Sequence, residues 1–253
     1  PRSTLFPYTT LFRSHLIRLI VTSKTYKQAS IARDDVNRVD PLNKYLSRQS
    51  RIRLDAELIR DAGLLVSDLL TTKIGGPRVY PPQPDGVYTF TQVNSSWPTS
   101  TGEDRYRRGM YTFFKRSAPH PLLSTFDTPT FNTTCTRRDR SNTPLQSLTI
   151  ANDTAFFEMA QMLGKRISDS PGTWEERLQY AFQICFARNS TDSESTRIKS
   201  YFDSQKPVFI QDQKSRTTIV GQNDDDSPIS SDQAAWVMVA RVLINLDEFI
   251  TRQ

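Results

Sequence analysis

Capping patterns placed directly before amphipathic stretches constrain the fold of this 253-residue chain most strongly. In each pattern a threonine is followed three residues later by Gln or Glu, so that the two side chains satisfy backbone N–H groups at a helix start. The pairs are Thr143 with Gln146, Thr173 with Glu176, and Thr191 with Glu194. Pro144 strengthens the first pattern, because proline is favoured at the first helical position. The patterns therefore predict helices that begin near residues 144, 174 and 192.

Apolar periodicity predicts further helices on either side of these three. The stretch from Arg51 to Leu70 carries one apolar stripe at helical spacing. The Asn152–Asp153 pair is expected to end the helix from residue 144 and to cap another. Ser230 and Gln233 are expected to start a last helix, to about Ile250. The residues expected to meet in one core are Trp236, Leu243 and Leu246 with Leu65 or Leu69.

The remaining segments are predicted to be irregular or extended. Gly75 and Gly76 permit a left-handed turn, and four prolines follow between residues 77 and 84, so residues 75–104 should form a long irregular segment. Trp97 is its expected anchor. Residues 204–229 are expected to be a surface loop, and alternating side chains from Arg108 to Lys115 indicate a short strand or hairpin. The predicted fold is mainly α, with long proline-rich irregular loops and at most a small β element.

The first fourteen residues, PRSTLFPYTTLFRS, are unusual as protein. They are the translation of a DNA string that resembles an adapter oligonucleotide used in short-read sequencing. They are too short and too polar for a membrane-spanning helix, and they lack the apolar core of a signal peptide. We interpret residues 1–14 as a non-native segment that packs poorly. Residues 15–253 are interpreted as a single helical domain, a C-terminal fragment of a larger protein.

Charge and cysteine content exclude some functions. Without Arg2 and Arg13 the chain has 31 basic and 27 acidic residues, a net charge of +4, which argues against a nucleic-acid partner. No apolar run approaches the length that a bilayer requires. Cys135 and Cys185 could be free thiols, one disulfide, or half of a metal site. Zinc-ligand spacing is absent, and so is the CxxCH motif that attaches haem c, so no metal or cofactor is expected within this chain.

Several segments together are similar to one known family. They are RLDAELIRDAGLLVSDLL, GGPRVYPPQP, RRGMYTFFKRSAPHPLLSTFDTP, CTRRDRSNTPLQSLTIAND and AAWVMVARVLINLDEFITR, in this order. The combination resembles the C-terminal domain of large planctomycete proteins that also carry a c-type cytochrome domain, catalogued as domain of unknown function 1553. The resemblance covers most of residues 15–253. It implies an exported, periplasmic or cell-envelope protein whose N-terminal part could hold haem c, and it supplies no catalytic residues.

Arginine-rich segments are the main candidates for a binding site. Guanidinium groups on irregular backbone can clamp a carboxylate, sulfate or phosphate, and loops commonly carry binding groups. The structural alternative is that these arginines fasten the loops to helices through carboxylates and carbonyls. Asp127 could join a site or cap a turn. The candidate residues are Arg105, Arg107, Arg108, Asp127, Arg137, Arg138, Arg140 and Trp97.

Three function classes remain open from the sequence. The first is a non-catalytic binding or scaffolding domain that contacts an anionic ligand, a polysaccharide or other domains of the same protein. The second is an enzyme acting on an anionic or sulfated polysaccharide, with Asp55, Glu57 and Asp127 as acid and base candidates. The third is nucleic-acid binding, which needs a continuous basic face. No GxSxG elbow or phosphate-binding glycine loop is present, so whether the chain is an enzyme stays open.

Overall fold

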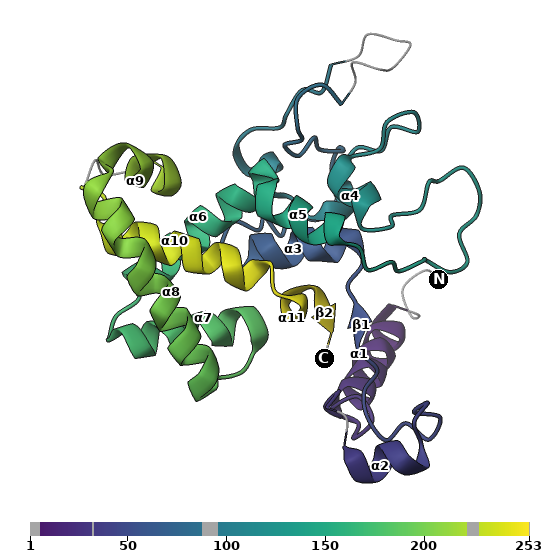
Figure 1. The fold of residues 1–253 in the computed structure, drawn as a ribbon. Coiled ribbons are helices and arrows are strands. Elements are labelled where there is room, and N and C mark those ends of the chain that lie inside the picture. Colours follow the sequence, from purple (N-terminus) through teal and green to yellow (C-terminus); the bar gives the residue numbers. More distant parts are fainter. Residues whose placement is uncertain (1–5, 32, 88–95, 222–227, 253) are drawn as a thin grey trace. The chain divides into compact units, whose positions relative to one another are not determined.

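The structure is a computed structural model that describes residues 6–31, 33–87, 96–221 and 228–252, with backbone only for Phe6 to Leu11. The chain divides into two compact units. Residues 54–250 form the main unit, and residues 1–53 with 251–253 form the terminal unit. Figure 1 shows the helices and strands of both units. The domain boundary predicted at residue 15 remains a prediction.

The main unit is mainly helical, as the sequence predicts. Two short 3-10 helices, η1 (Gly102–Tyr106) and η2 (Gly109–Tyr111), lie in its irregular region. The α-helices are α3 (Ala56–Val66), α4 (Pro121–Thr125), α5 (Pro144–Asn152), α6 (Thr154–Asp169), α7 (Trp174–Phe186), α8 (Asp192–Gln211), α9 (Gln213–Val220), α10 (Ser231–Ile244) and α11 (Asp247–Ile250).

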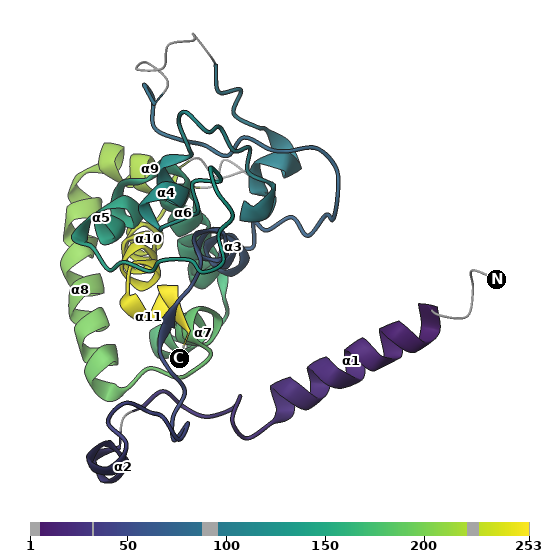
Figure 2. The ribbon, with the colours of Figure 1, turned by 90° about the vertical axis from the view of Figure 1, so that its right-hand side faces the viewer.

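Helix α10 is the centre of the core. It packs against α6 and α8, and Figure 2 shows α8 on one side of α10 and α3 on the other. Trp236 and Leu243 on α10 are fully buried together with Phe156 and Leu163 on α6. Gly164 allows α6 to approach closely, because a Cβ at this position would lie only 2.6 Å from the Cα of Val237.

The capping patterns start helices where the sequence places them. Capping boxes at Thr143, Thr173 and Thr191 open α5, α7 and α8. The Asp153 carboxylate caps α6, and the Ser230 hydroxyl accepts a hydrogen bond from the backbone N–H of Gln233 at the start of α10. These predictions are confirmed. The sequence was sufficient to make them because each cap depends only on contacts within four residues.

The bounds of two predicted helices and two of the predicted core residues need correction. The helix predicted from residue 51 to 70 begins at Ala56, after an extended Leu54 whose N–H bonds to the carbonyl of Ile250, and its C-cap is Ser67. The core takes Leu64 rather than Leu65, which is 61% exposed, while Leu69 packs against the core partly buried. The last helix ends at Ile244 rather than near Ile250, and a separate turn, α11, follows. The chain bends between α10 and α11, and this leaves Leu246 37% exposed.

Two segments between helices also differ from the predictions. Residues 108–115 contain η2 rather than a strand, and the only bridges described there pair Arg107 with Thr71 and Thr112 with Val79. The carboxylate of Asp61 accepts a hydrogen bond from the backbone N–H of Gly109. This contact favours a tight turn over sheet pairing. Residues 204–229 are not a loop throughout, because α8 continues through Pro207 to Gln211 and α9 follows. Pro207 cannot donate a backbone hydrogen bond, yet the helix continues past it and Phe209 is buried.

The terminal unit contains two helices and a small sheet. Helix α1 spans Phe6–Thr22, α2 spans Asp34–Val39, and β1 (Ile52–Arg53) pairs antiparallel with β2 (Thr251–Arg252). The adapter-like segment therefore extends into α1, and the described side chains from Phe12 to Ser14 are exposed. In the described part of the chain, no helix is both long and apolar enough to span a membrane.

Candidate binding site on the arginine-rich loops

The arginine-rich segments lie around α3 and α6. Residues 105–108 follow the irregular segment and include the end of η1, whereas residues 137–140 belong to the loop between α4 and α5. We call residues 128–140 the 128–140 loop. The carboxylates that face these arginines come from α3, from its N-cap Asp55 and from α6.

Arg138 and Arg140 tie the 128–140 loop to the start of α3. The two terminal guanidinium nitrogens of Arg138 donate to the carboxylate of Glu57, at 2.6 and 3.1 Å. Arg138 also lies 3.7 Å from Asp55, which accepts a 3.4 Å bond from Arg140. The hydrogen bond to Glu57 raises the pKa of the Arg138 guanidinium. Asp55 and Glu57, the acid and base candidates of the sequence, are therefore already bound to arginines.

Arg105 and Arg108 make the corresponding contacts for the other segment. Arg105 binds both carboxylate oxygens of Glu158 on α6, with the shortest N–O distance at 2.7 Å. Tyr106 donates to the same carboxylate at 2.7 Å. Arg108 donates to Asp61 on α3 at 2.8 Å. Hydrogen bonds to these acids raise the pKa values of Arg105 and Arg108. Both guanidinium groups thus have internal counter-charges.

Arg107 is fully buried and binds backbone carbonyls instead of an acid. Its guanidinium donates to the carbonyl oxygens of Gly75 and Pro77. It also lies 3.9 Å from the centre of the Tyr111 ring, a cation–π distance. Arg107 therefore holds the turn at Gly75–Gly76, where both glycines have positive φ, rather than presenting its charge to solvent.

Trp97 anchors the irregular segment, as the sequence predicts. Its indole Nε1 donates to the Pro81 carbonyl at 2.7 Å, and its ring packs against Tyr80, Phe113 and His120. His120 is 3% exposed, and its Nε2 lies 3.0 Å from the carbonyl oxygen of Pro82. Burial lowers the pKa of His120 to about 4. This aromatic cluster accounts for Trp97 without a ligand.

Asp127 closes the base of the 128–140 loop. Its carboxylate accepts hydrogen bonds from the backbone N–H of Ser141 at 2.8 Å and from the Ser141 hydroxyl at 2.9 Å. Gln146 is buried and donates to the carbonyl oxygens of Thr125 and Ser141. Asp127 therefore joins the two ends of the loop, which is the turn-capping alternative raised by the sequence.

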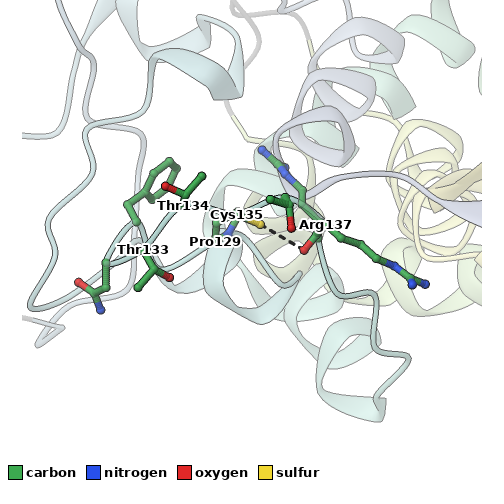
Figure 3. Close-up of a pocket in the computed structure, with 9 residues that line it drawn as sticks. Pro129, Thr133, Thr134, Cys135 and Arg137 are labelled. Carbon is green, nitrogen blue, oxygen red and sulfur yellow. Dashed lines mark hydrogen bonds between the residues drawn. The ribbon is translucent and has the colours of Figure 1, made fainter.

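Two adjoining hollows open on this loop, with volumes of about 690 and 490 Å³. Arg137 and Arg138 line both, and Asp127 lines the smaller one. Figure 3 shows Pro129, Thr133, Thr134, Cys135 and Arg137 around the larger hollow. Arg137 is exposed, and no hydrogen bond or ion pair from the described residues reaches its guanidinium. Arg105, Arg107, Arg108, Arg140 and Trp97 line neither hollow.

The structure leaves both cysteine thiols free. Cys135 is exposed and its Sγ donates to the Arg137 carbonyl oxygen at 3.2 Å, the dashed line in Figure 3. Cys185 is partly buried against the core, and burial raises its pKa to about 12. Within the described ranges, no group of three or more His, Cys, Asp or Glu side chains is arranged to hold a metal ion.

Comparison with protein-family profiles identifies the family of this chain. A family profile described as PSD1, protein of unknown function (DUF1553), matches residues 11–202. The chain belongs to the DUF1553 family. No curated protein and no solved structure is significantly similar to it. Family membership agrees with the resemblance read from the sequence motifs and leaves the activity open.

The sequence located the arginines but not their partners. Asp61 and Glu158 were not expected to bind them, although both are acids on helices that otherwise bury apolar side chains. Phe131 and the threonines of the 128–140 loop were missed as well. One sequence feature could have pointed to them. It is an aromatic residue within the threonine-rich stretch TPTFNTTCT, which has no helical or strand periodicity.

Proposed function

We propose that this domain is a non-catalytic binding domain that presents the 128–140 loop to an anionic partner. The single observation that supports this proposal is the division among the arginines. Five of the six candidate arginines bond to carboxylates or carbonyls of the protein, whereas Arg137 lines both hollows and its guanidinium has no such partner among the described residues. The five hold the loops in place, and Arg137 supplies the charge for binding.

The charge arrangement favours binding over catalysis. Acid–base cleavage of a polysaccharide requires two carboxyl groups on either side of the scissile bond. Asp55 and Glu57 line neither hollow, and their carboxylates accept hydrogen bonds from Arg138 and Arg140. Asp127 is bonded to Ser141. Enzymatic action on a sulfated polysaccharide is therefore the second candidate.

Isothermal titration calorimetry with dextran sulfate tests the proposal. Arg137→Ala should weaken binding about tenfold or more, because a charge-assisted hydrogen bond is worth roughly 1.5–3 kcal/mol. Arg197→Ala is the matched control, since it removes an exposed charge from α8. Equal affinities for the two variants, or no binding by the unmodified chain, would contradict the proposal. Release of new reducing ends from the polymer would favour the enzymatic candidate instead.

We propose in addition that the domain works within an exported, envelope-associated protein of planctomycete type. This setting rests on the family resemblance, which implies a c-type cytochrome domain elsewhere in the same protein. Haem staining and cell fractionation of the protein in the organism that encodes it test this setting. A haem-positive periplasmic or envelope fraction is expected, and a haem-free cytoplasmic protein would contradict it.

A further inference from the structure

The larger hollow combines four kinds of side chain that together suit one class of ligand. Its volume of about 690 Å³ lies within the range of roughly 300–1,000 Å³ that is usual for small-molecule sites. An aromatic ring, an amide and a guanidinium line it, alongside the hydroxyls of three threonines. They are Phe131, Asn132, Thr133, Thr134, Thr136 and Arg137. Hydroxyl and amide groups both donate and accept hydrogen bonds, so they match a ligand that is rich in hydroxyls.

Phe131 is the feature that a purely anionic ligand does not explain. The side chain is 55% exposed on the loop, although aromatic side chains usually bury most of their surface. Its ring packs edge-on against Phe114, with 4.4 Å between ring centres, so its position is fixed by the main unit. A fixed and exposed aromatic ring can pack against the apolar face of a sugar ring.

The surroundings of the hollow are held in place without a ligand. Arg116 donates two hydrogen bonds to the Asn132 side-chain oxygen, at 3.1 and 3.0 Å. Arg138 is held by Glu57, and Asp127 with Ser141 closes the loop. A binding surface that is already ordered loses less conformational entropy when a ligand binds.

We propose that the 128–140 loop binds an acidic glycan, with a sugar ring on Phe131 and its carboxylate or sulfate on Arg137. The inference rests on the proposed anion-binding function and names its ligand class. In this proposal Phe131 makes the loop selective for acidic glycans over other polyanions. Arg137 contributes to the binding of any anion.

The test compares three probes on the full chain: a heparin hexasaccharide, inorganic polyphosphate and neutral dextran. We expect Phe131→Ala to weaken heparin binding about tenfold and to leave polyphosphate binding unchanged. Phe131→Trp, which keeps an aromatic surface, should retain heparin binding. Arg137→Ala should weaken binding of both polyanions. Thermal unfolding of each variant checks that the fold is intact.

The outcomes separate this inference from the function on which it rests. If Phe131→Ala leaves heparin binding unchanged, or weakens polyphosphate binding equally, the glycan inference is wrong while anion binding stands. If dextran binds as tightly as heparin, the acidic part of the inference is wrong. If neither polyanion binds, both the inference and the proposed function fail.

Discussion

At the scale of single residues, buried polar side chains hold irregular backbone to the helices. Arg107 bonds to the carbonyls of Gly75 and Pro77, and His120 contacts the carbonyl of Pro82 and the ring of Trp97. Arg60 is 2% exposed and donates to the carbonyl of Arg105. Each of these groups replaces backbone hydrogen bonds that a helix or sheet would otherwise supply.

The charge of His120 makes the stability of the fold dependent on pH. Its pKa in the folded chain is lowered to about 4 from 6.5, by burial first and by the charge of Arg60 in addition. Between these values the unfolded chain binds the proton and the folded chain does not, so stability falls as pH decreases through this window. We expect a loss of about 2 kcal/mol between pH 7 and pH 5.

Urea unfolding at several pH values measures this loss. His120→Gln should remove most of the slope between pH 7 and pH 5, whereas His15→Gln, at an exposed position, should leave it unchanged. The same slope in both variants would show that His120 does not carry the effect.

At the scale of elements, the sequence predicted the features that local contacts determine, such as the starts of helices. The starts of α5, α7 and α8 follow from residues within one turn of each cap. The turn at η2 was not predictable, because the Asp61 carboxylate that accepts the Gly109 N–H lies 48 residues away in the chain. The fold class was therefore readable from the sequence, whereas strand and loop assignments that depend on distant contacts were not.

Close packing of α6 on α10 gives a prediction at this scale. Gly164→Ala places a Cβ 2.6 Å from the Val237 backbone, so the helices must separate, and we expect a loss of roughly 1–3 kcal/mol in stability. Gly63→Ala on α3 is the matched control. Its nearest neighbour, also at 2.6 Å, is the sulfur of Met159, on a flexible side chain that can move. Chemical unfolding should rank Gly164→Ala as clearly more damaging, and equal losses would contradict the close approach.

At the scale of the whole molecule, the proposed function divides the candidate arginines between fastening the loops and binding a partner. The sequence showed both alternatives for these residues, binding or fastening, but not which arginine takes which role. That choice depends on carboxylates from other elements, such as Glu57 and Glu158, whose positions follow only from the tertiary fold. Stability should therefore depend on the fastened arginines, and binding on the exposed one.

Urea unfolding of Arg107→Met, Arg138→Ala and Arg137→Ala tests this division most directly. Arg107→Met removes the two hydrogen bonds that this fully buried guanidinium donates to the carbonyls of Gly75 and Pro77, and should cost about 2–3 kcal/mol. Arg138→Ala breaks a partly exposed pair with Glu57 and should cost about 1 kcal/mol. Arg137→Ala should change stability by less than about 0.5 kcal/mol. A loss for Arg137→Ala as large as that for Arg107→Met would contradict the account.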